Sequence, residues 1–239
     1  MPGFWLGAWA WEEVAGYLRE GGYEVHALTY PGLEVRSVDR AAIALEDHIK
    51  AVTEVVAELD KGGRRVCLVG HSGAGAVVYG ATDRLAARGC TALRRVVYVD
   101  SGPLPNGVAL SPDLDPAVVE LPLPSWPEPE ANGSSQAGLG QAALARFREL
   151  AVPHPARAAR DPLRLTTNER RETPVTFVTC SFSLDQVKAM ASAGHPFFAE
   201  MDGLDATYVE LETGHGPMWS RPDDLAEILR REAVRREPG

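Results

Sequence analysis

Short, apolar, mostly β-branched runs alternate along this chain with stretches that have the periodicity of amphipathic helices. The runs that we expect to form strands are residues 23–28, 65–69, 95–99, 174–179 and 206–211. The second, third and fourth runs are apolar at nearly every position, which is typical of strands covered on both faces. The alternation predicts an α/β fold, with a mostly parallel sheet and helices on both of its faces.

Helical patterns separate these strands. One apolar stripe is formed by residues that recur at intervals of four and three, namely Leu45, Ile49, Val52, Val56 and Leu59. We expect further helices directly after the second strand, over residues 73–88, and at the end of the chain, after Ser220.

Residues 104–170 break this alternation. They contain a Pro-rich run at 112–129 and one good helical pattern at about 141–150. We expect a core formed by 1–103 and 171–239, with 104–170 inserted after the third strand as a mainly helical lid over the active face.

Composition and charge exclude several function classes. The chain has 239 residues, which fits one large α/β domain, and a formal net charge of −9, so its average surface repels nucleic acid. Its three cysteines have neither metal-ligand nor disulfide-framework spacing. Because no apolar run reaches about 18 residues and no signal peptide precedes the fold, we expect neither membrane spanning nor export, and a cytoplasmic location is the default. The sequence does not indicate an oligomeric state.

The strongest local motif is Gly-His-Ser-Gly-Ala-Gly at residues 70–75, between a predicted strand and a predicted helix. A serine on such a tight turn is exposed at the carboxyl end of the sheet, at the amino terminus of the following helix. The usual pattern is Gly-x-Ser-x-Gly, and here Ala74 stands for the second glycine, with Gly75 next to it. The alternative is a simple helix-packing turn, but the context favours Ser72 as a nucleophile.

A second motif, Thr-Gly-His-Gly-Pro at residues 213–217, follows the last predicted strand. A serine nucleophile needs a base within hydrogen-bond reach, and an imidazole is suited to taking and returning a proton. Because the carboxyl ends of parallel strands meet at one edge of a sheet, His215 is predicted to lie on the same face as Ser72. By itself the motif would more often be an ordinary turn.

Together these motifs resemble the α/β-hydrolase superfamily, and most closely its compact branch of small esterases and hydroxynitrile lyases. The resemblance covers nearly the whole chain outside 104–170. In that branch a loop similar to residues 2–9 follows the first core strand, so the resemblance implies an oxyanion hole formed by the backbone amides of Phe4 and Gly73. It also implies that a strand should precede Pro2. That first core strand is missing here, and we expect the natural protein to begin further upstream with a short apolar β-run.

The third member of the triad departs from the usual family pattern. The family's usual position, three residues after Cys180, is occupied by Ser183, which cannot act as the acid. Asp185 is two residues further on, in a predicted helix. A minority of the superfamily has its acid at the end of the strand after the nucleophile helix, which corresponds to Asp100 here. We favour Asp100 and keep Asp185 as the alternative; Asp100 would hold His215 in the required tautomer.

These residues predict a serine hydrolase that cleaves a small-molecule carboxylic ester or lactone through an acyl-enzyme, without a metal or an organic cofactor. Four apolar residues on loops of the active face are candidates for the substrate pocket: Trp5, Trp126, Met218 and Trp219. The same catalytic residues also serve carbon–carbon bond hydrolases and lyases, which remain alternatives. The lyases commonly use a lysine in the pocket. This chain has few lysines, which argues against lyase activity. A non-enzymatic receptor for a small ligand remains a further alternative.

Overall fold

The computed structural model describes residues 1–125, 135–195, 197–201 and 203–235. Its main sheet has four parallel strands in the order β1-β2-β5-β6. The four strands are β1 (Val66–His71), β2 (Leu93–Val99), β5 (Val175–Thr179) and β6 (Ala206–Glu210). This confirms the predicted α/β class and four of the five predicted strands.

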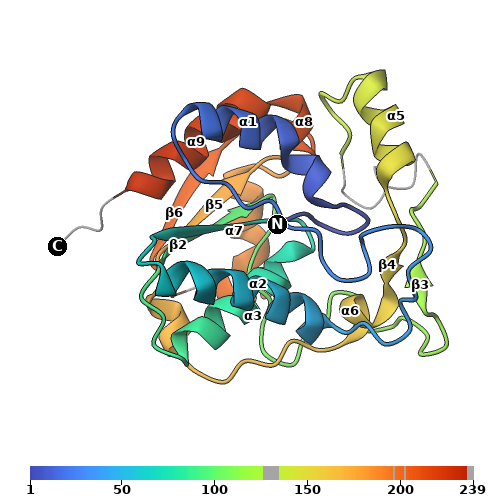
Figure 1. Cartoon of the computed structure of the whole chain (residues 1–239), viewed down its shortest axis with the longest axis horizontal. Helices are drawn as coiled ribbons and strands as arrows, with labels where there is room; N and C mark the ends of the chain where they lie inside the picture. Colours follow the sequence, from blue (N-terminus) through green and yellow to red (C-terminus); the bar gives the residue numbers. More distant parts are fainter. Residues whose placement is uncertain (126–134, 196, 202, 236–239) are drawn as a thin grey trace.

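The sheet is covered on both faces, as Figure 1 shows. Two helices before and after the nucleophile strand, α2 (Leu45–Lys61) and α3 (Ala74–Ala86), pack on one face. The other face carries η1 (Ala8–Trp11), α1 (Glu12–Glu20), α8 (Pro217–Ser220) and α9 (Pro222–Val234). Helix α7 (Leu184–Ser192) connects β5 to β6 and is followed by a short turn, η3 (Ala199–Met201).

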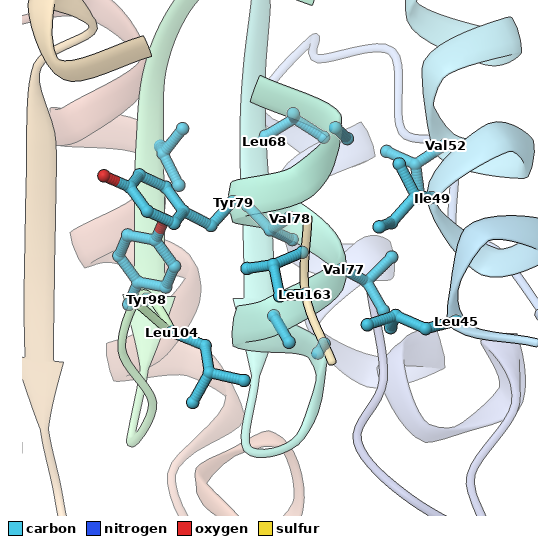
Figure 2. Packing of buried hydrophobic residues seen from close by; sticks show 14 of the residues in the cluster. Leu45, Ile49, Val52, Leu68, Val77, Val78, Tyr79, Tyr98, Leu104 and Leu163 are labelled. Carbon is cyan, nitrogen blue, oxygen red and sulfur yellow. The ribbon is translucent and has the colours of Figure 1, made fainter. Parts of the chain in front are cut away.

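The apolar core has two parts because neighbouring residues of a strand point to opposite faces of a sheet. On β2, Val96 and Tyr98 pack in the cluster that includes α2 and α3, whereas Val97 and Val99 pack in the cluster that includes α1 and α9. Figure 2 shows the first cluster, with the side chains of α2 on one side of α3 and Tyr98 on the other. All four β2 residues are at most 1% exposed, which is why this strand reads as a continuous apolar run.

The predicted strand at 23–28 is wrong: these residues form no ladder. A strand needs a partner that supplies a row of backbone donors and acceptors. The backbone next to β1 on this side belongs to Met1, whose amine donates to the carbonyl of Val69 at 2.6 Å and whose carbonyl accepts from His71 at 3.1 Å.

The described part of 104–170 contains a two-stranded antiparallel pair and short helices rather than a mainly helical unit. The pair is β3 (Glu120–Leu121) with β4 (His154–Pro155), and the helices are α5 (Gln141–Leu150) and α6 (Ala156–Arg160). Most of the rest of the described stretch is loop. Three of its loop residues, Leu104, Val152 and Leu163, are nevertheless buried in the core cluster of α2 and α3. A turn, η2 (Glu169–Glu172), leads from it into β5.

None of the helices that the structure describes is long and apolar enough to cross a membrane.

Candidate active site

Ser72 lies on a strained turn between β1 and α3. Its φ is 54°, a left-handed value that a non-glycine residue seldom adopts. Gly75 permits this turn to approach the loop after β2, because a Cβ at position 75 would lie 2.1 Å from the carbonyl oxygen of Gly102. The other non-glycine residues with positive φ in the described ranges are Trp5 (65°) and Asp100 (43°), so backbone strain is concentrated around Ser72.

The three residues predicted as a triad are brought together with hydrogen-bonding geometry. The Oγ of Ser72 lies 2.8 Å from His215 Nε2, and Asp100 Oδ2 lies 2.6 Å from His215 Nδ1. Parallel pairing explains this placement, since His71 lies opposite Val99 in the register and the next residues, Ser72 and Asp100, leave the sheet side by side. An ionised Asp100 accepts the Nδ1 hydrogen, which leaves Nε2 free to take the proton of Ser72.

The carboxylate of Asp100 is almost fully buried and has several donors. Its Oδ1 accepts from the backbone amides of Cys180 and Ser181 at 3.0 and 3.1 Å, and its Oδ2 accepts from the Ser181 hydroxyl at 2.5 Å. Burial raises the pKa of Asp100, but the hydrogen bond and charge of His215, together with these donors, outweigh it and bring the pKa below its ordinary value. The carboxylate therefore stays ionised near neutral pH.

Asp185, the alternative acid, lies in the first turn of α7, and the ring nitrogens of His215 bond to Asp100 and Ser72 instead. Ser183 is the N-cap of that helix and accepts from the amide of Gln186.

His71, next to the nucleophile, holds the loop of His215. Its Nε2–H donates to the carbonyl oxygen of His215 at 2.6 Å. Burial, aided by the charge of His215, lowers the pKa of His71 to about 3, so the ring remains neutral and keeps that donor. On the other side of the loop, the amide of His215 donates to the carbonyl of Ser135 at 2.7 Å.

The loop of Phe4 lies directly against Ser72. A Cβ on Gly3 would approach Ser72 Cβ to 2.8 Å, and one on Gly73 would approach the Phe4 ring to 2.6 Å. In the part of the chain that the structure describes, the amides of Phe4 and Gly73 donate to no protein acceptor. Both amides therefore belong to the two loops that meet at Ser72, and neither is used by the described part of the protein. His154 stacks on the Phe4 ring at 4.0 Å between centroids.

A cavity of about 250 Å³ opens beside Ser72 and His215. Apolar and aromatic side chains form most of its wall, among them Leu104, Phe177, Phe182, Phe197, Phe198 and Met201. Of the described residues that line it, Asp100 and His215 are the ones able to carry a charge, and both belong to the hydrogen-bonded set.

The predicted pocket residues that the structure describes do not form this wall. Among the described residues, Trp5, Met218 and Trp219 do not line the cavity, and Trp126 lies outside the described residues. Met218 is fully buried in the core cluster of α1 and α9. Trp219 stacks on Trp9 at 5.8 Å, and the indole of Trp5 donates to the carbonyl of Leu121 at 3.0 Å. Each of these side chains is thus occupied by packing or by a loop contact.

Sequence reasoning missed the residues that support the site. Ser181 and the two phenylalanines at 197 and 198 belong to loops after β5 and α7, and no periodic pattern of residues marks these loops. No group of three or more His, Cys, Asp or Glu side chains in the described ranges is arranged to hold a metal ion.

Comparison with known proteins assigns the family. The model of the alpha/beta hydrolase family matches residues 1–228. The chain belongs to this family. A carbendazim hydrolyzing esterase from Nocardioides sp. (strain SG-4G) is 30% identical to this α/β hydrolase in an alignment of 252 residues that covers 96% of this chain and 96% of that protein.

Solved structures share the fold of this α/β hydrolase at lower identity. An extracellular α/β-hydrolase from a Paenibacillus species superposes with a TM-score of 0.73 at 19% identity, covering 99% of this chain and 98% of that one. A methylesterase from Arabidopsis gives a TM-score of 0.72 at 17% identity, with 97% and 96% covered.

Proposed function

We propose that this α/β hydrolase cleaves a small, neutral carboxylic ester or lactone through an acyl-enzyme formed on Ser72. The observation that carries the proposal is the continuous hydrogen-bonded series Ser72–His215–Asp100, with distances of 2.8 and 2.6 Å. The similarity to an esterase over 96% of the chain supports the same reaction class.

In the proposed reaction, His215 Nε2 takes the Ser72 proton while Oγ attacks the ester carbonyl carbon. The amides of Phe4 and Gly73 would donate to the oxyanion, where the loss of one such donor typically costs on the order of 10²–10³ in turnover. His215 then protonates the leaving alkoxide, and the alcohol departs. A water molecule, deprotonated by the same ring, attacks the acyl-enzyme and releases the acid and Ser72.

The wall of the cavity favours a neutral, apolar acyl or alkoxy group. A charged group would lose its hydration there and, among the described lining residues, would meet no charged partner apart from Asp100 and His215. Lys188, the lysine nearest in sequence to the cavity segments, lies over the ring of Tyr208 at 5.7 Å. This placement offers no support for lyase chemistry.

We also propose that residues 104–170 act as an insertion that supports the two loops of the site. Ser135 accepts from the amide of His215, and Val152 donates to the carbonyl of Trp5 at 3.1 Å. The indole of Trp5 in turn donates to Leu121. These contacts connect the insertion to the base and to the oxyanion loop.

A fluorophosphonate probe tests the proposal together with a panel of p-nitrophenyl esters and lactones. We expect one phosphonyl group on Ser72, identified by peptide mass spectrometry, and hydrolysis that disappears in Ser72→Ala. A receptor with an intact triad would be labelled but would not turn over any member of the panel. Absence of labelling at Ser72 would contradict the proposed nucleophile.

A further inference from the structure

One wall of the cavity is a short segment that is not part of the sheet. Residues 197–201 supply Phe197, Phe198 and Met201 to the lining. The segment ends in η3 and crosses close to the loop after β2, where a Cβ on Gly102 would lie 3.4 Å from the carbonyl oxygen of Phe197. A segment of this length has little regular hydrogen bonding of its own, so its position depends on contacts with the rest of the fold.

Glu200 supplies such contacts. Its Oε2 accepts from the Tyr79 hydroxyl at 2.8 Å and from Arg171 Nη1 at 2.9 Å, and it lies 3.8 Å from Arg170 Nη2. The Glu200 side chain is 18% exposed, so these charge-assisted contacts are partly shielded from water. The carboxylate thus connects the cavity wall to η2 and to α3, the helix that begins two residues after Ser72.

Tyr79 is a rigid anchor for this carboxylate. It is 1% exposed, and Figure 2 shows it extending from α3 toward the side where Tyr98 lies, away from α2. The guanidinium of Arg170 lies 5.3 Å from the centre of its ring. Burial, and then the hydrogen bond and charge of Glu200, raise the pKa of Tyr79 to about 12, so the phenol keeps the hydrogen that it donates.

We propose that Glu200 is a positioning residue that sets the substrate selectivity of the cavity, through its contacts with Tyr79, Arg170 and Arg171. It touches no reacting atom. It fixes the segment that carries Phe197, Phe198 and Met201, so the cavity has a defined shape for an apolar acyl chain. This inference rests on the proposed esterase function and adds to it the residue that controls acyl-group preference.

The test compares kcat/KM for p-nitrophenyl hexanoate and p-nitrophenyl acetate in the wild type and in Glu200→Ala. A short acetyl group can make few contacts with the cavity wall, so kcat/KM for the acetate should stay within about twofold. The hexanoate should lose about tenfold, the value of one to two buried methylene groups, mainly through KM. An equal fall for both esters would indicate general damage and overturn the proposal.

Tyr79→Phe keeps the ring and removes only the hydroxyl, so it serves as the variant that preserves packing. We expect the hexanoate-to-acetate ratio to fall severalfold, and the effect of Tyr79→Phe to be largely absent when Glu200 is already alanine. Glu172→Ala removes an exposed carboxylate of η2 and should leave the ratio unchanged. An unchanged ratio in Tyr79→Phe would contradict the anchoring role.

Failure of the proposed function gives a different result. If hydrolysis of the acetate does not depend on Ser72, the esterase assignment fails before any ratio is measured. If Ser72-dependent hydrolysis is present and the ratio is insensitive to Glu200, only the selectivity role fails.

Discussion

The hydroxyl of Ser181 donates to Asp100 at 2.5 Å, although the two residues are 81 positions apart. Ser181 follows β5, the strand after which this family more often has its acid, and Asp100 follows the neighbouring β2. The end of β5 therefore supplies hydrogen-bond donors to a carboxylate from the next strand. Because β2 and β5 are adjacent and parallel, their carboxyl ends lie close together, and an acid after β2 can stand in for one after β5.

Asp100→Asn should reduce kcat by about 10⁴ if the residue acts like the aspartate of a serine protease. The amide cannot stabilise the imidazolium and favours the wrong tautomer of His215. Steady-state kinetics on the best p-nitrophenyl ester measures the effect, with Asp185→Asn as a matched control that retains activity. Full activity in Asp100→Asn, or a large loss in Asp185→Asn, would overturn the assignment of the acid.

Ser181→Ala should lower kcat by about tenfold to a hundredfold, because a hydrogen bond to a buried charge is typically worth about 1.5–3 kcal/mol. The pKa of Asp100 should rise as that donor is lost. Ser183→Ala, two residues further on, removes the N-cap of α7 and should cost about 1 kcal/mol of stability without a change in kcat. Similar kcat losses in both variants would argue against a specific role of Ser181.

His48 predicts how stability depends on pH. Burial lowers the pKa of His48 to about 4 from 6.5, although its hydrogen bond to Pro31 opposes the shift. The unfolded chain takes up this proton below pH 6.5 and the folded protein only near pH 4. The free energy of unfolding is therefore not reduced by His48 well above pH 6.5, and it falls as the pH is lowered. Between pH 7 and pH 5 this residue should lower it by about 2 kcal/mol.

Urea unfolding of the wild type and of His48→Gln at pH 7 and pH 5 measures this contribution of His48. The free energy of unfolding of this variant should depend less on pH than that of the wild type, by that amount. His71, with a pKa of about 3, and His154, whose burial lowers its pKa well below the ordinary value, add to the same loss. Equal pH dependence in His48→Gln and the wild type would show that His48 is not buried as a neutral ring.

Alanine variants of Met218 and Phe182 should distinguish a core residue from a cavity residue. Met218→Ala should destabilise the protein by about 2–5 kcal/mol, because the residue is fully buried. It should leave the relative rates on short and long esters unchanged. Phe182→Ala should enlarge the cavity and shift preference toward bulkier acyl groups. Thermal unfolding and the ester panel distinguish these outcomes, and the reverse pattern would restore Met218 as a pocket residue.

Much of the fold and the core of the site follow from the sequence, because both depend on local patterns. The continuous apolar runs of β1, β2 and β5 reflect burial on two faces, and the motifs around Ser72 and His215 are local turns at strand ends. Asp100 was favoured only through its resemblance to a minority of the superfamily, because its contact with His215 depends on which strand lies next to β1. The hydrogen bonds that hold it could be seen only when the ends of β2 and β5 were placed together.

The lining of the cavity beside Ser72 was not predictable in the same way. Met218 and Trp219 follow His215 closely in the sequence, but the turn at Pro217 begins α8 and directs Met218 into the core. The actual lining comes from the loops after β5 and α7, at positions such as Phe182 and Phe198. Which loop folds back over a site depends on tertiary contacts, such as those of Glu200, that leave no periodic signal.

The most direct test of the central claim is a double-mutant cycle of kcat on one p-nitrophenyl ester, with Ser72→Ala, His215→Ala and the double variant. Because nucleophile and base act as a unit, each single change should cost on the order of 10⁶, and the double variant should be hardly worse than either. Losses that multiply in the double variant would show that the two residues act independently, and would contradict the proposed mechanism.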